Sequence, residues 1–142
     1  MFFGSYQHNL DAKGRLMIPA RFKNEAGNVL YVMKGFDGAL SVYKETEFQK
    51  LIQSAETLPF NKRDSRDYLR IQLASVRELE IDKLGRILLP KELLNKYHIG
   101  KEVIVIGVGD HMEIWDRGAF EEYEKKTNEA FEDIAENLGK VE

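Results

Sequence analysis

Residues 10–19 read LDAKGRLMIP, and residues 81–90 read IDKLGRILLP. The two stretches share the same spacing of aspartate, glycine, arginine and proline, with a constant offset of 71 residues. The similarity extends outward, because residues 40–48 correspond to residues 112–120 in the same way after one insertion. A repeat with a fixed period indicates a duplicated structural unit. The chain is therefore expected to contain two copies of one small module.

Each copy predicts the same order of elements. Residues 5–18 predict a hairpin, because two strand-like runs flank a turn in which Gly14 can adopt a positive φ. Pro19 lacks an N–H group and suits the first turn of a short helix. The β-branched run at residues 29–33 predicts another strand, followed by a turn and a last short strand. The second copy repeats this order, with its β-branched run at residues 103–108, so each copy is expected to be a ββαββ unit of an α+β fold.

Helical spacing of apolar residues appears outside these units. Residues 46–56 and 61–74 each predict a helix, with Pro59 between them. The C-terminal segment predicts an acidic helix with an apolar seam, formed by Phe120, Tyr123, Thr127, Phe131, Ile134 and Leu138. The expected domains are a first module at 5–47, a helical connector at 48–75, a second module at 76–119 and the C-terminal acidic helix at 120–142. The exposed seam predicts a homo-oligomer larger than a dimer.

Composition restricts the class of protein. The chain has 142 residues, 43% hydrophobic and 32% charged, which is enough apolar material for a compact core. Residues 1–10 lack the pattern of a signal peptide or membrane span, so a cytoplasmic protein without membrane contact is expected. The absence of cysteine excludes disulfides and thiolate chemistry. The net charge is -3, but eight acidic and three basic residues lie from Gly118 onward, so the total neither supports nor excludes DNA binding.

Catalytic and metal-binding signatures are missing from the sequence. The three histidines, His8, His98 and His111, lack the spacing of metal ligands. Gly107 and Gly109 begin a pattern like G-x-G-x-x-G, but Met112 occupies its third glycine position. We therefore expect neither an enzyme nor a cofactor or metal site.

The paired D-x-x-x-R segments, each followed by an apolar triplet and a proline, resemble the hallmark of the MraZ family of bacterial transcriptional regulators. Further matching segments are MFFGSY at 1–6, KRDSR at 62–66, VIGV at 105–108 and EIWD at 113–116. The resemblance covers essentially the whole chain. It implies two tandem AbrB-like swapped-hairpin modules that form a double-split β-barrel pseudo-dimer with flanking helices. It also implies a ring-shaped homo-oligomer, associated with the nucleoid, that represses a cell-division and cell-wall operon by binding promoter repeats in double-stranded DNA.

The residues expected to contact DNA are Asp11, Lys13, Arg15, Asp82, Lys83 and Arg86. Arginine presents a permanently charged, planar set of donors that can contact phosphate or bind a guanine edge. An aspartate four residues earlier can orient that group across a tight turn. The alternative is that both pairs are salt bridges that only fix the turn, and the second copy with the same spacing favours function. Leu84 stands at the position of Lys13 in the repeat, so the two loops are expected to contribute unequally.

Two other interpretations of basic and acidic segments remain open. The arginines at 63, 66, 70 and 77 are expected to form a solvated or ion-paired face and are not included in the site. The preferred interpretation of the acidic C-terminal helix is a solvated face, and the second interpretation is a regulatory or partner-binding arm. The alternative function is therefore an AbrB-like protein-interaction or antitoxin-type module that uses this helix to bind another protein.

Overall fold

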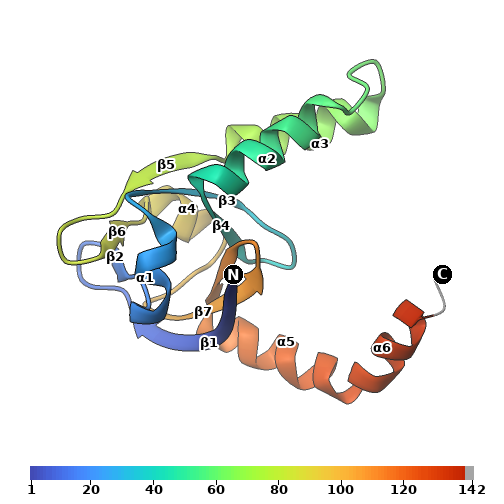
Figure 1. Cartoon of the computed structure of the whole chain (residues 1–142). Helices are drawn as coiled ribbons and strands as arrows, with labels where there is room; N and C mark the ends of the chain where they lie inside the picture. Colours follow the sequence, from blue (N-terminus) through green and yellow to red (C-terminus); the bar gives the residue numbers. More distant parts are fainter. Residues whose placement is uncertain (140–142) are drawn as a thin grey trace.

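A computed structural model describes residues 1–139 of the chain and has the α+β class expected from the sequence (Figure 1). Its elements, in order, are β1 (Phe2–Asn9), β2 (Arg15–Met17), α1 (Ala20–Ala26), β3 (Val29–Lys34), β4 (Leu40–Lys44), α2 (Glu45–Glu56), α3 (Arg63–Ala74), β5 (Arg77–Glu80), β6 (Arg86–Leu88), α4 (Lys91–Lys96), β7 (Glu102–Gly109), β8 (Met112–Asp116), α5 (Arg117–Glu129) and α6 (Phe131–Gly139). The order ββαββ occurs twice, as predicted. No helix among the described residues is long and apolar enough to cross a bilayer.

The two halves exchange strands. A six-stranded antiparallel sheet has the order β1-β7-β8-β4-β3-β5, and β2 pairs with β6 in a separate two-stranded ribbon. The first strand of each half thus pairs with the other half, and the strand order reads the same when the halves are interchanged. Within residues 1–139 the strands form two sheets and not a closed barrel. The expected α+β class is therefore confirmed, whereas the expected double-split barrel is not.

The local hairpins predicted around Gly14 and Gly85 are wrong. The turns are present, with φ of 87° at Gly14 and 83° at Gly85, but the strands on either side of each turn do not pair. β1 pairs over its whole length with β7, whereas the three-residue β2 pairs with β6. A turn motif reports only that the chain reverses direction. It cannot distinguish a partner strand nearby in the sequence from one in the second copy.

One apolar core joins both halves. Phe22 of α1 packs edge-on against Phe2 and Tyr6 of β1, with ring centroids 5.1 and 5.2 Å apart. Leu93 of α4 is the equivalent of Phe22 in the second half, and it belongs to the same buried cluster. Pro19 directly precedes α1 as its cap residue, one position before the first turn in which it was expected. Because the core draws on both halves, each half needs the other to bury its apolar face.

Two helical arms project from this body on the side opposite β2 and β6 (Figure 1). α2 and α3 lie within two residues of their predicted bounds. The single C-terminal helix predicted at 120–142 is instead two helices, α5 and α6, separated at Ala130, and its residues 140–142 lie outside the described part of the chain. Neither glycine nor proline marks this break, and the apolar spacing continues through it. No sequence signal therefore indicates where α5 ends. None of these four helices contains a buried residue.

Candidate nucleic-acid interface

The first D-x-x-x-R loop is organised by the carboxylate of Asp11. Its Oδ1 accepts hydrogen bonds from the backbone N–H groups of Lys13 and Arg15, at 3.0 and 2.9 Å. Its Oδ2 accepts from Nε of Arg15 at 2.6 Å. The N–H of Gly14 donates to the Asp11 carbonyl and closes the turn, which requires the positive φ that glycine adopts without strain. One side chain therefore fixes both the turn and the arginine.

The second loop repeats this geometry. Oδ1 of Asp82 accepts from the N–H groups of Leu84 and Arg86, both at 2.9 Å, and Oδ2 accepts from Nε of Arg86 at 2.8 Å. The aspartate and arginine expected to act together thus form an ion pair in each copy. These bonds alone are equally compatible with a purely structural pair.

Most of the hydrogen-bond donors of both arginines nevertheless remain free of protein partners within the described part of the chain. Each uses Nε for its aspartate, and within residues 1–139 the terminal Nη groups of Arg15 and Arg86 have no hydrogen-bond partner. The side chains are 31% and 23% exposed. A guanidinium held at Nε and open at both Nη groups has a fixed plane and two adjacent donors, which is the geometry that recognises phosphate or a guanine edge.

The two loops are bonded to each other across the ribbon. The N–H of Ile18 donates to the carbonyl of Gly85 at 2.9 Å, and the N–H of Leu89 donates to the carbonyl of Gly14 at 3.0 Å. These reciprocal bonds place the loops in one rigid unit. These backbone bonds therefore fix the relative positions of the two arginine backbones.

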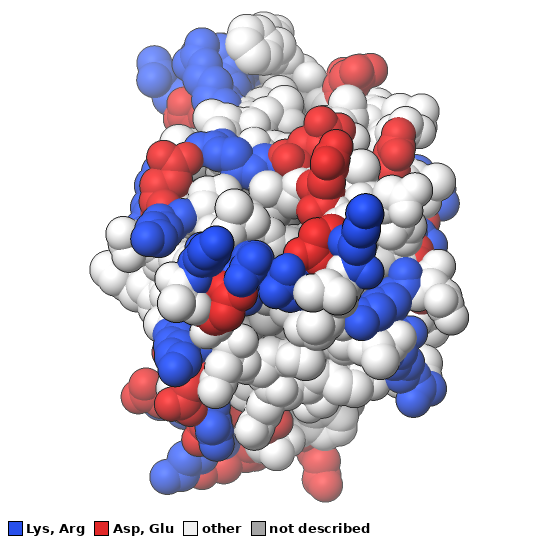
Figure 2. All heavy atoms as spheres, turned by 90° about the vertical axis from the view of Figure 1, so that its left-hand side faces the viewer, with Lys and Arg blue, Asp and Glu red and all other residues white. Residues whose placement is uncertain are grey.

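The ribbon directs both arginines outward. Arg15 lies opposite Leu88, and Arg86 lies opposite Met17, with the buried pair Leu16 and Ile87 between them. Because side chains alternate along a strand, the arginines share the face opposite to that buried pair, at its two ends. Figure 2 shows the side of the molecule that carries the loops, with Lys and Arg gathered in a band across its middle and acidic side chains among them.

The charge of Asp11 is stabilised by its loop. Hydrogen bonding lowers its pKa to about 2, mainly through the backbone N–H of Arg15, with further contributions from the Arg15 side chain and the N–H of Lys13. The pKa of Asp82 is also lowered, and the backbone N–H of Arg86 is the main cause. Both carboxylates are thus ionised at physiological pH, so each can pair with its arginine.

The loops differ in their lysines. Lys13 and Lys83 are exposed and occupy different positions of the repeat, as the sequence indicates. A third lysine, Lys23 of α1, was missed: a Cβ built on Gly85 would lie only 2.6 Å from its Cε, so this side chain covers the second loop. Its equivalent in the repeat is Leu94, which lies beside Gly14. The offset of 71 residues equates Lys23 with Leu94, but no sequence signal indicates that Lys23 lies against the loop of the other half.

The remaining basic and histidine residues lie elsewhere. α3 ends at Ala74, so Arg77 belongs to β5, where it pairs with Glu92, and the four arginines do not form one helical row. Among the described residues no cluster of His, Cys, Asp or Glu could hold a metal ion. His111 instead stacks on Tyr43 and bonds to Asp110.

Comparison with known proteins agrees with both the repeat and the extent of the resemblance. A family model described as "MraZ protein, putative antitoxin-like" matches twice, at residues 1–71 and 73–141. A protein of Caldanaerobacter subterraneus named transcriptional regulator MraZ is 44% identical over 138 residues, which cover 97% of this chain and 96% of the relative. Relatives of the same name are 44% identical in Thermoanaerobacter pseudethanolicus, over 99% of each chain, and 41% identical in Desulforamulus reducens, over 97% of each.

Proposed function

The chain belongs to the MraZ family, and on this premise we propose that it is a transcriptional regulator that represses by binding double-stranded DNA through its two D-x-x-x-R loops. The observation that carries the proposal is the state of Arg15 and Arg86, whose Nη groups are open while their Nε groups are held. Because the Nη donors are open, each arginine can bind DNA while its aspartate holds Nε, and the same geometry occurs in both copies. The contact residues proposed are Asp11, Lys13, Arg15, Asp82, Lys83 and Arg86, with Lys23 added.

The strand exchange supports a further proposal about architecture. We infer that residues 5–47 and 76–119 are two AbrB-like swapped-hairpin modules, linked by a connector at 48–75 and followed by a helical segment from residue 120. The pairing of β1 with β7 and of β5 with β3 is what such an intramolecular pseudo-dimer requires. Its two equivalent loops then meet at β2 and β6, and one chain presents two reading elements.

The targets proposed are repeated promoter sites of a cell-division and cell-wall operon, bound by a ring-shaped homo-oligomer in the cytoplasm, at the nucleoid. A ring presents many identical loops, so several correctly spaced repeats should bind with avidity that a single repeat cannot reach. No catalytic step or cofactor forms part of this proposal.

An antitoxin-type protein-interaction module is the second candidate function. The family description includes the term antitoxin-like, and the arms expose apolar side chains that a protein partner could cover. In that case the arms and not the loops would carry the function.

An electrophoretic shift experiment with the DNA upstream of the protein's own gene tests the proposal. Replacing Arg15 or Arg86 with alanine should weaken binding by about 1–3 kcal/mol for each lost contact, and the double variant should scarcely bind. Arg117→Ala is the matched control, because this arginine pairs with Glu102 and Glu121 away from the loops. A folded double variant that shifts the DNA at the concentration required for the wild type would refute the assignment of the loops.

A further inference from the structure

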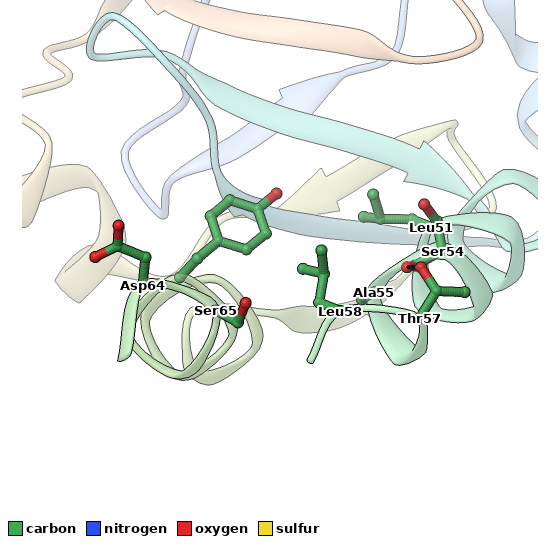
Figure 3. A pocket seen from close by; sticks show the side chains of 8 residues that line it. Leu51, Ser54, Ala55, Thr57, Leu58, Asp64 and Ser65 are labelled. Atoms are coloured by element: carbon green, nitrogen blue, oxygen red, sulfur yellow. Dashed lines mark hydrogen bonds between the residues drawn. The ribbon is translucent and has the colours of Figure 1, made fainter. Parts of the chain in front are cut away.

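The first D-x-x-x-R loop borders a pocket of about 290 Å³. Asp11 and Gly14 line it from the loop, and α4 with the segment after it, residues 91–101, supplies most of the remaining lining. A groove of about 490 Å³ between α2 and α3 lies on one of the arms instead, and Asp64 is its only charged lining residue (Figure 3). The smaller pocket is thus the one that adjoins the loop and combines cations with apolar side chains.

The apolar part of this pocket belongs to the core of the molecule. Leu10, Leu94 and Ile99 line the pocket and are buried members of the core cluster. Backbone bonds hold these walls in place. The N–H of Leu10 donates to the carbonyl of Lys101 at 2.8 Å, and the N–H of Ile99 donates to the carbonyl of Leu94, also at 2.8 Å. The pocket is therefore preformed and has an apolar base, as most small-molecule sites have.

The second half of the chain builds this pocket with residues that the first half lacks. Residues 91–101, which join Pro90 to β7, are two more than residues 20–28, which join Pro19 to β3. The longer segment contains Ile99 and Gly100, and both line the pocket. The pocket is consequently a feature of one loop and not of the repeat.

The space beside the second loop is occupied by a side chain. Lys23 stands there in the place of Leu94, and its Cε lies 2.6 Å from a Cβ built on Gly85. At the first loop the nearest atom of Leu94 lies 3.9 Å from a Cβ built on Gly14. Leucine is shorter than lysine, so the first loop has open space where the second has a covering side chain.

Two lysines make the open pocket attractive to an anion. Lys91 and Lys101 line it and are exposed. Within residues 1–139 neither forms an ion pair, because the adjacent glutamates at 92 and 102 pair with Arg77 and Arg117 instead. Both ammonium groups can therefore turn toward a ligand in the pocket.

Asp11 is the only carboxylate in the lining, and it does not cancel these charges. One of its oxygens accepts from the N–H groups of Lys13 and Arg15, and the other accepts from Nε of Arg15. Asn95 adds a neutral amide to the lining. The polar groups that remain for a ligand are thus mainly cationic.

We propose that this pocket binds a small organic anion. Its apolar body contacts Leu10, Leu94 and Ile99, and its oxyanion group pairs with Lys91 and Lys101. An inorganic anion would leave the apolar base uncovered, and a neutral apolar molecule would leave the lysines without a partner. The volume has room for a body as large as a bicyclic aromatic ring.

The bound anion weakens DNA binding by the first loop. It lies beside Asp11 and Gly14, within the distance of about 8 Å over which charges act at physiological salt. Its negative charge repels the phosphates that the loop is proposed to approach. By linkage, DNA weakens binding of the anion by the same factor. This regulatory step rests on the proposed function, whereas the binding of the anion does not.

Calorimetric titration of the full-length chain with 2-naphthoate, without DNA, tests the site. One probe should bind per chain, and the variant carrying Lys91→Ala and Lys101→Ala should bind it about tenfold more weakly or worse. Lys96→Ala is the matched control, because this lysine lies on the same helix but lines another pocket. Arg86→Ala removes an open guanidinium of the second loop and should also leave the affinity unchanged. Acetate, which lacks the apolar body, and 2-naphthylmethanol, which lacks the charge, should each bind at least about tenfold more weakly than 2-naphthoate.

Three results would overturn the binding site: no binding of 2-naphthoate up to millimolar concentration, equal binding of acetate or 2-naphthylmethanol, and an unchanged affinity in the double lysine variant. Saturating 2-naphthoate should lower the affinity of the wild type for its operator by about fivefold or more, and the double lysine variant should lose this effect. An operator affinity that 2-naphthoate leaves unchanged would overturn the regulatory step. A wild type that binds 2-naphthoate but no DNA would instead refute the proposed function and leave the binding site standing.

Discussion

Leu16 and Ile87 face each other at the centre of the β2–β6 ribbon, and both are completely buried. Each belongs to the loop that carries one arginine, so a single apolar contact supports both loops. We expect Leu16→Ala or Ile87→Ala to lower the free energy of unfolding by about 2–5 kcal/mol in urea denaturation. Leu88→Ala, one residue along the same ribbon but 54% exposed, is the control and should change it by no more than about 0.5 kcal/mol. Equal effects of Ile87→Ala and Leu88→Ala would refute this central role.

Removing the charge of the orienting aspartates should reduce specificity more than affinity. Asp11→Asn and Asp82→Asn retain an oxygen that can accept the turn N–H groups, but they no longer hold Nε of the arginine by charge. A less fixed guanidinium can still contact phosphate, whereas bidentate base recognition requires its plane to be set. The ratio of affinities for operator and random DNA should therefore fall, as measured by competition binding. Asp67→Asn on α3 should leave this ratio unchanged, and an unaltered ratio in the Asp11 variant would contradict the orienting role.

The order of the first loop should survive to strongly acidic pH. A carboxyl whose pKa is lowered by folding contributes stability above its unfolded value of 3.8, and this contribution disappears as the pH falls through the folded value of about 2. Titration of the Asp11 carboxyl carbon by NMR should have its midpoint near the lower value. A midpoint close to 3.8 would show that the Arg15 and Lys13 N–H groups do not hold the carboxylate in solution.

The unequal lysines predict unequal contributions to salt dependence. Lys13→Ala, Lys83→Ala and Lys23→Ala should each reduce the slope of log affinity against log salt by about 1 for every phosphate contact removed. Leu84→Lys should increase it, because a cation then occupies the position that Lys13 holds in the first loop. Lys125→Ala on α5 is the control. If Lys23→Ala behaves like this control, Lys23 only covers the Gly85 turn.

Gly107 allows β1 to reach its place in the sheet. It lies opposite Gly4, and a Cβ at this position would lie 2.2 Å from the backbone nitrogen of Phe3. The obstacle is backbone, so Gly107→Ala must displace β1 and should cost about 3 kcal/mol, near the upper end for overpacking. Gly118→Ala, in the first turn of α5 with a nearest contact at 3.5 Å, should be neutral or slightly stabilising. Thermal unfolding of the two variants compares them directly.

The sequence predicts local features of this fold well. The glycine turns, the short helices after Pro19 and Pro90, and the bounds of α2 and α3 all follow from residues within a few positions of each other. Partner choice does not follow in this way. Nothing near β1 indicates that it pairs with β7, because the register is decided by packing in a core that both halves share.

The site was predictable to a similar degree. The spacing of Asp11 and Arg15 predicts their ion pair, and the repeat predicts its second copy. Neither predicts that the two loops would be bonded to each other, or that Lys23 would cover Gly85, because both contacts join residues from different halves. The break at Ala130 was missed for another reason, since no glycine or proline marks it and the apolar spacing continues through it.

The exchange of β1 between halves has a consequence during synthesis. Residues 2–9 leave the ribosome before their partners at 102–109, which follow about a hundred residues later. At a translation rate of roughly 5–20 residues per second, the first strand waits about 5–20 s for its partner strand. The strands β3 and β4, which pair with each other, and the helices α1 to α3 are complete long before. Until β7 emerges, the apolar side chains of β1 therefore lack their native partner strand.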